Sequence, residues 1–579
     1  MKIILGLNIY HADASACIIK NGNLLFAIEE ERINRIKHWA GLPINAINEC
    51  LKYTGIEINE ITDIAINTSP LSNIFPKSFY FLKNYLSGKK KFEIYKRIKK
   101  KLNLLLDLNK SFYPKKLSSK IKIHYVDHHK SHIASAFYPS GFDKAIGLSV
   151  DGFGDFCSLA ISKCNNSRIE IVDRVYFPDS LGIFYEAFTQ FLGFKKYGDE
   201  YKIMGLSSYG KPIYYDLIKR NLFKNDNNFE LNLKFFNHTN KNYKYNFKGY
   251  PKQKIIFKNN IKKIFNIKNS IDFKTLKFKK DVASSVQKVF EEHLINICKK
   301  ISYLDYSKNL VYAGGCALNS LANKKIFESK IFNKVFIPYA PGDGGGAIGA
   351  ALNVLKSYNK NCKFHNLKSP YIGPKYKNSE ISKELFNNKN LKKHEIIFEK
   401  NEKLLLKKIA RYIYQNKVVG FFNDRMEFGA RALGNRSILA NPCNPKMRNL
   451  LNKKIKKREN FRPFAPAILD QHKSKWFDNK VDNSYMSSVE NIIEKKRKYI
   501  PSVTHIDGTG RVQTVKKNLN KNFFNLINEF YKLSNVPILL NTSFNENEPI
   551  VMSHHHAINC FLRTKMDILV INNFIIKRK

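Results

Sequence analysis

Alternating apolar and polar stretches predict a strand and a hairpin at the start of the chain. Residues 3–8 form an apolar run that ends in a polar turn, as expected for a short buried strand. Two further apolar runs flank Asn21 and Gly22, the residue pair most typical of a two-residue hairpin turn. The first 30 residues therefore predict a strand, a polar loop and a hairpin.

The same pattern returns between residues 145 and 174. An apolar run ends in the sequence SVDGFGD, and two strand-like segments follow around a polar turn. Such a recurrence indicates an internal duplication. Segments 310–323 and 335–352 then each run from a strand through a glycine-rich turn into a helix start, a geometry that lets the backbone approach a nucleotide.

Any one of these loops would also fit an ordinary tight turn of an α/β protein. Four of them in this order resemble the actin-like ATPase superfamily, and we expect its duplicated α/β fold in the first 350 residues. Residues 356–400 are polar, contain Pro370 and Pro374, and show no clear periodicity before residue 402. This break predicts a domain boundary.

Beyond the break the pattern is again that of an α/β domain. KLLLKKIARYIYQN predicts an amphipathic helix, and strands are predicted at 418–422, 536–543 and 568–574. A chain of 579 residues is too long for one ordinary core. We therefore predict two domains, residues 1–355 and 356–579.

The net charge of +51 would by itself favour nucleic acid or another anionic partner. The excess is mainly lysine mixed with asparagine and isoleucine, as in 90–104 and 247–269, which is typical of genome-wide compositional drift. We therefore do not expect nucleic acid as the partner, and the positive field also suits phosphorylated substrates.

The nine cysteines are scattered and form no C-x-x-C pair, which argues against a disulfide framework or a thiolate zinc site. The apolar N-terminal run is interrupted by Asn8, His11 and Asp13, and no run of about 18 apolar residues follows. We expect no membrane span and a cytoplasmic location.

The sequence DHHKSH carries a candidate metal site. His128 and His132 stand at i and i+4 and would share one face of a helix, although surface or capping histidines would fit as well. Asp151 and Asp343 could complete a set of two nitrogens and two oxygens, which suits Fe(II), Mn(II) or Zn(II). His129 lies off that face. The run His554 to His556 cannot converge on one metal ion.

A second cluster is cationic and lies in segments 420–442 and 453–469. Glycine, proline and phenylalanine fix the backbone there, as expected for a clamp that binds phosphate through bidentate hydrogen bonds. Ion pairs with Glu427 and Glu459 are the alternative. The cations are Arg431, Arg436, Lys456, Arg458 and Arg462. Later polar residues could orient a planar acyl group or a nucleotide, or simply form turns: Asp507, Thr509, Arg511, Ser543 and Asn545.

At these residues the chain resembles the NodU/TobZ-type O-carbamoyltransferase family. The similarity runs from residue 3 to about residue 575, with Ala430 standing where the family pattern has proline. It is carried by GLNIYHADASA, EEERINRIKH, DHHKSHIASAF, SVDGFGD, KIMGLSSYGKP, GGCALN, PGDGGGAIGAA, RMEFGARALGNRSILANP, RENFRPFAP, HIDGTGRVQTV and NTSFNENEPIV.

The resemblance implies two active sites. A C-terminal domain similar to the YrdC-like fold would use carbamoyl phosphate and ATP, with Mg²⁺ accompanying the nucleotide, to make carbamoyl adenylate. A TsaD-like N-terminal domain would pass the carbamoyl group to a hydroxyl of a small sugar-like or natural-product acceptor. The sequence does not name that acceptor, and a homodimer stays open.

The resemblance also assigns residues. Iron is the metal that it suggests, on His128, His132, Asp151 and Asp343, and His11 is a candidate general base or substrate contact. The carbamoyl phosphate site matches Arg431, Lys456, Arg462, Ser543 and Asn545, the first three also stabilising charge on the departing phosphate. Nucleotide contacts are expected at Gly152, Gly314, Gly315, Asn319, Asp343 and Arg511.

Two rival functions remain. The TsaD-like half and the positive charge would also fit a tRNA carbamoyl-type modification enzyme, but no RNA-reading aromatic module is visible, and the C-terminal motifs mark the small-molecule branch. A scaffolding protein of actin-like fold that has lost catalysis is disfavoured, because the histidines and the basic clamp residues are intact.

Overall fold

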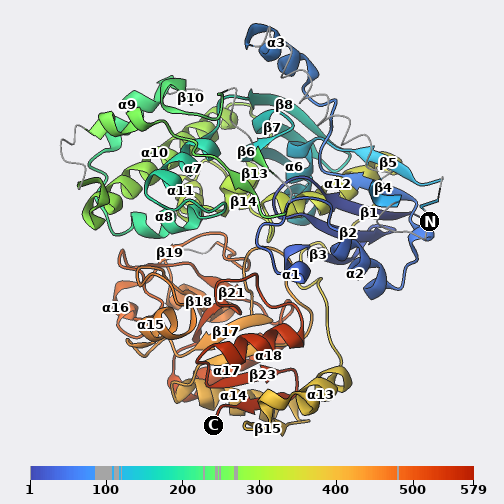
Figure 1. Ribbon diagram of the computed structural model, residues 1–579, viewed down its shortest axis with the longest axis vertical. Helices are drawn as coiled ribbons and strands as arrows, with labels where there is room; N and C mark the ends of the chain where they lie inside the picture. The colour runs from blue at the N-terminus through green and yellow to red at the C-terminus, as the bar shows by residue number, and fades with distance from the viewer. Residues whose placement is uncertain are drawn as a thin grey trace.

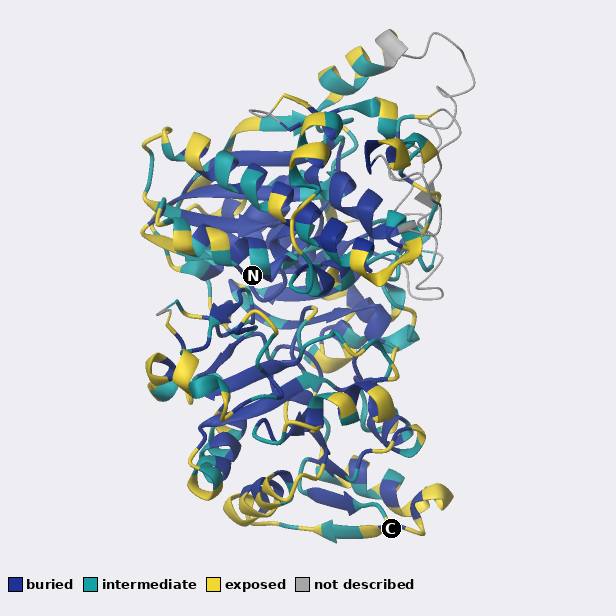
Figure 2. Cartoon of the chain, turned by 90° about the vertical axis from the view of Figure 1, so that its left-hand side faces the viewer, coloured by how far each residue is buried: buried dark blue, intermediate teal, exposed yellow. Residues whose placement is uncertain are grey.

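The computed structural model describes residues 2–84, 107–109, 117–118, 120–225, 229–240, 245–246, 249–265, 272–478 and 481–579. Two halves lie one above the other (Figure 1). The N-terminal half contains two five-stranded sheets, and the C-terminal half contains one eight-stranded sheet. In Figure 2 the strands of both halves are largely buried.

The first sheet contains both antiparallel and parallel strands, because a hairpin precedes the parallel strands. β1 pairs antiparallel with β2 and parallel with β4. In spatial order the strands are β3 (Asn23–Glu29), β2 (Ser15–Lys20), β1 (Ile3–Asn8), β4 (Asp63–Ile66) and β5 (Lys122–Tyr125). Asn21 and Gly22 join β2 to β3 with φ of +48° and +86°, the two left-handed residues of the predicted hairpin turn.

The second sheet repeats this topology. β6 pairs antiparallel with β7 and parallel with β13. In spatial order the strands are β8 (Arg168–Tyr176), β7 (Cys157–Asn165), β6 (Lys144–Gly154), β13 (Asn309–Ala313) and β14 (Lys334–Phe336). The predicted internal duplication is therefore confirmed at the level of strand order and direction.

Two helices from different parts of the chain pack together beside both sheets: α6 (His128–Ser140) and α12 (Asp343–Tyr358). Glycine makes this approach possible, because a Cβ on Gly349 of α12 would lie 1.8 Å from the carbonyl oxygen of Ser131 on α6. A Cβ on Gly6 of β1 would likewise lie 2.2 Å from the carbonyl oxygen of Ala347. The backbone contact brings the first residues of the two helices close together.

The second sheet carries a further layer of helices around one apolar cluster. These helices are α7 (Leu181–Phe191), α8 (Glu200–Ser207), α9 (Tyr215–Leu222), α10 (Leu276–Ser302) and α11 (Ser320–Ser329). The first sheet is flanked by α1 (Glu31–Asn34) and α2 (Ile44–Thr54), and α3 (Ile74–Asn84) projects from the top of this half (Figure 1). Short strands lie between α9 and α10: β9 (Phe223–Asn225), β10 (Glu230–Leu231), β11 (Tyr245–Asn246) and β12 (Lys252–Gln253).

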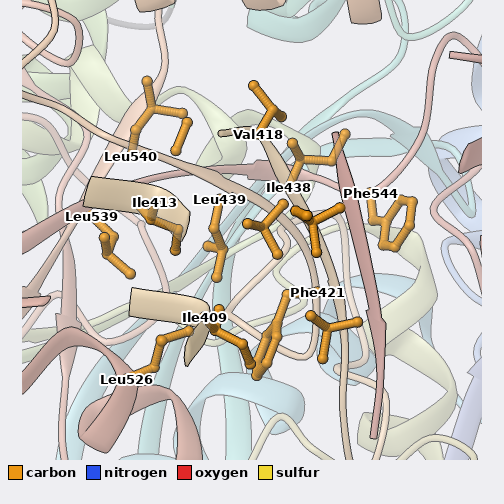
Figure 3. Packing of buried hydrophobic residues seen from close by; sticks show 14 of the residues in the cluster. Ile409, Ile413, Val418, Phe421, Ile438, Leu439, Leu526, Leu539, Leu540 and Phe544 are labelled. Carbon is orange, nitrogen blue, oxygen red and sulfur yellow. The ribbon is translucent and has the colours of Figure 1, made fainter. Parts of the chain in front are cut away.

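The C-terminal sheet has the order β15 (Glu395–Phe398), β24 (Phe574–Lys577), β23 (Ile568–Ile571), β16 (Val419–Phe422), β17 (Arg436–Ala440), β22 (Ile538–Ser543), β18 (Ala465–Leu469) and β21 (Gln513–Val515). α14 (Glu402–Tyr414) and α17 (Lys521–Ser534) pack on it. Side chains such as Ile409, Phe421 and Leu526 form their common core (Figure 3). The remaining elements are α13 (Asn378–Asn387), α15 (Met447–Leu450), β19 (Glu490–Asn491), α16 (Glu494–Arg497), β20 (Thr509–Gly510) and α18 (His554–Arg563).

The predicted elements of this half are present. α14 and the strands β16, β22 and β23 coincide with the apolar patterns to within a few residues. The sequence analysis missed α13 and β15, because their apolar positions are few and lie within a polar stretch. α12 continues to Tyr358, so the proposed boundary at residue 356 falls in its last turn. None of the described helices is both long and apolar enough to cross a membrane.

Candidate functional site

Four predicted ligand side chains meet where three elements come together. His128 and His132 lie on the first turns of α6, Asp151 lies near the end of β6, and Asp343 begins α12. The two Nε2 atoms are 3.0 Å apart. The Oδ2 atom of Asp151 lies 3.3 and 3.1 Å from them, and the Oδ1 atom of Asp343 lies 3.6 and 3.4 Å from them.

This arrangement fits a metal ion. Four ligand atoms at about 2.1 Å from a tetrahedral ion would lie about 3.4 Å from one another, close to the distances observed. Two Nε2 atoms at 3.0 Å also cannot both carry a proton, so either one proton or a cation must lie between them. The Nδ1 atoms of both histidines are buried without a hydrogen-bond partner among the described residues.

The electrostatics of this cluster are those of paired opposite charges. Burial alone would lower the pKa of His132, but Asp151 and Asp343 outweigh it and raise the pKa to about 9. Burial and the charge of Asp151 raise the pKa of Asp343. The hydrogen bonds from His128 and His132 overcome burial and lower the pKa of Asp151 well below its usual value.

A carboxylate from the duplicated loop holds the start of α6. Asp155 accepts hydrogen bonds from the backbone N–H of His128 at 3.0 Å, the hydroxyl of Thr68 at 2.6 Å and the backbone N–H of Ser69 at 2.7 Å. Asp155 therefore ties the start of α6 to the loop after β4. His129 faces away, with Nε2 3.0 Å from the carbonyl oxygen of Cys157.

The first polar loop reaches the same place. The ring of His11 lies on the ring of His128, with centroids 4.7 Å apart. A second group, Asp13, Glu31 and His38, also brings its ligand atoms together. Its charges are already matched within the protein, because His38 Nδ1 is 2.8 Å from Asp13 Oδ1 and Glu31 pairs with Arg32 at 2.7 Å.

The glycines of the glycine-rich turns differ in whether the surrounding structure leaves room for a side chain. Gly314, at φ +94°, would place a Cβ 2.2 Å from the carbonyl oxygen of Val150, and Gly315 would place one 2.8 Å from the carboxylate of Asp151. Gly152 faces open space. Only the first two glycines are thus required by contacts of the fold itself.

Asn319 is engaged by the fold. Its side-chain oxygen caps α11 by accepting from the N–H of Ala322 at 3.1 Å, and its amide exchanges two hydrogen bonds with Gln287. The side chain is therefore occupied in holding α11 against α10, and a nucleotide contact would have to come from the backbone here.

The cationic cluster of the C-terminal half is centred on Lys456, which is 1% exposed. A π-helical turn, Leu451–Ile455, precedes it. Its Nζ lies 2.6 Å from both the carbonyl oxygen of Ser543 and the side-chain oxygen of Asn545. The carbonyl oxygen of Asn545 and the hydroxyl of Ser543 follow at 2.9 and 3.2 Å. Lys456, Ser543 and Asn545 are thus brought together as predicted, at the end of β22.

Arg458 and Arg462 lie near Lys456, and Arg431 and Arg511 extend this group, without a matching set of acids. Burial, followed by the charges of Arg431, Arg458 and Arg462, lowers the pKa of Arg511 well below its usual value. Burial lowers the pKa of Arg431 to about 10 and that of Arg458 to about 9. Among the described residues, the only ion pair of these arginines is the one of Arg462 with Glu459 at 3.9 Å. Such a cluster is ready to receive a polyanion.

Arg436 has a different role from the other cations of its segment. It is fully buried, stacks on Phe422 at 3.7 Å and donates to backbone carbonyl oxygens of Asn423, Asp424 and Pro374. Arg436 therefore fixes the loops around the site. Among the described residues Glu427 forms no ion pair, which was the alternative from the sequence, and its carboxylate instead accepts the backbone N–H groups of Leu433 and Arg436.

Sequence reasoning placed Arg458 in the cationic cluster without assigning it to a substrate, and it missed Lys37. Arg458 belongs to the cluster and donates to Asn452 at 2.7 Å. Lys37 comes from the N-terminal half, and burial together with the charge of Arg462 lowers its pKa. The segment RIKH contained the signal for Lys37, but only the packing of the halves shows where it lies.

The three consecutive histidines near the C-terminus do not share one ligand position. His554 and His555 both contact the carboxylate of Glu384, and among the described residues His556 forms no ion pair with it.

The two clusters are joined by one short loop. Gly315 abuts the carboxylate of Asp151, and Arg431 donates to the carbonyl oxygen of Leu318 at 3.0 Å. Three residues span at most about 11 Å. The halves are further linked by Arg32, which donates to the carbonyl oxygen of Gly429 at 2.9 Å.

Comparison with protein-family models shows two matches that cover most of the chain. Residues 3–352 match the model described as carbamoyltransferase N-terminus, and residues 410–578 match carbamoyltransferase C-terminus. The chain is 34% identical to an uncharacterized protein of Synechocystis sp., covering 100% of this chain and 97% of that one. It is 32% identical to the nodulation protein NolNO of Sinorhizobium fredii, covering 99% and 80%.

Proposed function

Because the chain belongs to the carbamoyltransferase family, we propose that it is an ATP-dependent O-carbamoyltransferase with separate sites for activation and transfer. The observation that carries the proposal is a group of five cations that lacks a matching set of carboxylates: buried Lys456 and the half-buried Arg431, Arg458, Arg462 and Arg511. A protein holds so much unpaired positive charge at a cost. Bound phosphate groups would offset that cost.

Activation is assigned to this cluster. Carbamoyl phosphate and ATP are both polyanions, and Arg431, Arg462 and Lys456 would bind them and stabilise the charge that develops on departing phosphate. Atom balance requires water: water releases phosphate from carbamoyl phosphate, and an oxygen of the resulting carbamate attacks the α-phosphate of ATP. The products are carbamoyl adenylate, phosphate and pyrophosphate.

The polar residues at the end of β22 would orient the small acyl group. Ser543 and Asn545 already hold the ammonium of Lys456 through four oxygen atoms. This network fixes where the positive charge points, and a fixed charge stabilises a transition state without reorganisation. Arg511, whose pKa is lowered by burial and by the charges of the neighbouring arginines, would contact the nucleotide.

Transfer is assigned to the N-terminal half. His128, His132, Asp151 and Asp343 would hold a divalent metal ion, iron being the one that the family resemblance suggests, and such an ion polarises a carbonyl group when bound. His11, against the ring of His128, would take the proton of the acceptor hydroxyl. AMP would leave as the hydroxyl oxygen bonds to the carbamoyl carbon. The short segment Gly315–Leu318, which lies against Asp151 at one end and Arg431 at the other, supports a hand-over between nearby sites.

The test separates the two steps. Purified protein with ATP and carbamoyl phosphate should release pyrophosphate without any acceptor. A variant with His128→Ala and His132→Ala should retain this release and lose transfer to a hydroxylated acceptor. Folding of the variant is checked by circular dichroism, since loss of a metal can unfold a domain. Loss of both activities in a folded variant would contradict the two-site proposal.

A further inference from the structure

A pocket of the C-terminal half lies outside the residues assigned so far. It has a volume of about 410 Å³ and is lined by residues of α15, of α16 and of the segment that follows α16. The two helices neighbour each other in the C-terminal half (Figure 1). Small-molecule sites usually have volumes of about 300 to 1,000 Å³, so the pocket is large enough for an organic ligand.

One part of the lining is cationic. Arg448, Arg497 and Lys498 line the pocket, and no carboxylate is found among its described lining residues. None of these three cations forms an ion pair in the part of the chain that the structure describes. The side chains of Arg448 and Lys498 also donate no hydrogen bond there. Unpaired cations that meet at a cavity favour an anionic ligand, and guanidinium groups favour phosphate in particular.

The fold fixes the guanidinium group of Arg497. Its Nε atom donates to the carbonyl oxygen of Ile492 at 3.0 Å. Gly508 lies directly against the group, because a Cβ at this position would come within 2.5 Å of the Cζ atom of Arg497. The absence of a side chain at Gly508 therefore leaves the room that the guanidinium group occupies. A planar donor that is already held in place suits the oxygen atoms of a phosphate group.

The other part of the lining is apolar. Pro445 and Pro501 contribute their rings, and Ile506 lines the same pocket with 61% of its surface exposed. A bare phosphate ion would leave this apolar part unused. Sites for organic ligands combine apolar side chains with a few charged groups that fix the orientation of the ligand. The lining therefore fits a molecule that carries both phosphate groups and a ring.

The pocket adjoins the cationic cluster around Lys456. Thr504 lines the pocket, and His505 follows it in the chain. Burial, together with the charges of Arg511 and Arg448, outweighs the opposite effect of a nearby carboxylate and lowers the pKa of His505 to about 4. Arg448 of the pocket and Arg511 of the cluster are thus neighbours of the same imidazole. A ligand of the pocket therefore lies beside the cluster.

We propose that the pocket lined by Arg448, Arg497, Lys498 and Ile506 binds the nucleoside triphosphate that is used in activation. The three cations bind phosphate oxygens, and the base packs against Ile506 and the two proline rings. Arg511 contacts the same triphosphate from the side of the cationic cluster. The inference rests on the proposed function, because it assigns a place to the ATP of that reaction, but binding of ATP can be measured without the reaction.

The experiment is a calorimetric titration of the full chain with ATP in the absence of carbamoyl phosphate. The variant with Arg448→Ala and Lys498→Ala should bind ATP at least about tenfold more weakly than the wild type, because it lacks two charged donors to phosphate. Neither side chain has a hydrogen bond to lose within the described residues, so the fold should be retained. The matched control carries Lys403→Ala and Lys407→Ala at exposed positions of α14 and should bind ATP like the wild type.

A second variant, Ile506→Ser, distinguishes a nucleotide from a simple anion. It should weaken ATP binding about threefold or more, because the base loses an apolar contact, and leave the binding of inorganic pyrophosphate unchanged. The proposal is overturned if the wild type does not bind ATP or if the double variant binds it like the wild type. Equal binding of pyrophosphate and ATP, with no effect of Ile506→Ser on either, would show a simple anion site instead.

Release of pyrophosphate with carbamoyl phosphate present is measured in parallel. If the wild type binds ATP, the double variant does not, and no pyrophosphate is released, the proposed activation is wrong and the nucleotide pocket stands.

Discussion

Truncation of Arg431 should damage activation while sparing the fold. Within the described part of the chain its side chain makes one hydrogen bond, to the carbonyl oxygen of Leu318 at 3.0 Å, and no ion pair. Loss of that bond costs about 1 kcal/mol. Burial lowers the pKa of Arg431 to about 10, which corresponds to a destabilisation of the charged form by about 3 kcal/mol. Arg431→Ala removes that destabilisation.

The two terms oppose each other, so the free energy of unfolding should stay within about 2 kcal/mol of the wild type. Activation should change far more. Removing one donor that stabilises developing charge typically costs about 10²- to 10³-fold in rate. Arg431→Ala should therefore release pyrophosphate about 100 to 1000 times more slowly. Arg431→Lys keeps the charge but loses the planar guanidinium group. Its rate of pyrophosphate release should lie between those of the wild type and Arg431→Ala.

The assay measures acceptor-independent pyrophosphate release at saturating ATP and carbamoyl phosphate, beside urea unfolding of each variant. Lys454→Ala is the matched control, because it removes a positive charge two residues from Lys456 at an exposed position, and its rate should match the wild type. The reasoning is refuted if Arg431→Ala releases pyrophosphate at the wild-type rate. A rate loss accompanied by an equally large loss of stability would refute the separation of function from fold.

Three further outcomes are expected. Arg436→Met should lower the free energy of unfolding by at least about 3 kcal/mol, since several buried carbonyl oxygens lose their donor; urea unfolding checks this. Elemental analysis should find about one transition metal per chain, lost when His128 and His132 become alanine. The third outcome concerns the ion pair of His38 with Asp13. Burial lowers the pKa of His38, but the charge and hydrogen bond of Asp13 outweigh burial and raise this pKa to about 9. The pair should therefore add about 1 to 3 kcal/mol of stability below about pH 6.5, lost as the pH rises through about 9 and missing from His38→Gln.

Local patterns were enough to predict the elements and several neighbours. The pair Asn21 and Gly22 specifies a turn with two left-handed residues, and that turn is present. The i, i+4 spacing of His128 and His132 places both rings on one side of α6. The repeated strand and loop pattern predicts two sheets of the same topology. Each of these follows from geometry within a few residues of chain.

Other properties depend on contacts between distant segments. Arg436 resembles Arg431 in sequence context, yet Arg436 is enclosed by backbone carbonyl groups, whereas Arg431 has a single hydrogen-bond partner among the described residues. Asn319 follows a glycine-rich turn, but its amide is occupied by Gln287 from α10. Lys37 joins the arginines of the other half only because the two halves pack together. The sequence around each residue carries no record of these partners.

The candidate metal site separates what the sequence determines from what the tertiary structure decides. The sequence by itself determined which side chains could act as ligands and put two of them on one helical turn. Only the tertiary structure decided that Asp151 and Asp343 join them, because that depends on the contact of α6 with α12. The absence of a Cβ at Gly349 allows that contact. Packing of backbones, which no local spacing encodes, brings carboxylates from two other elements within 3.6 Å of the same pair of nitrogens.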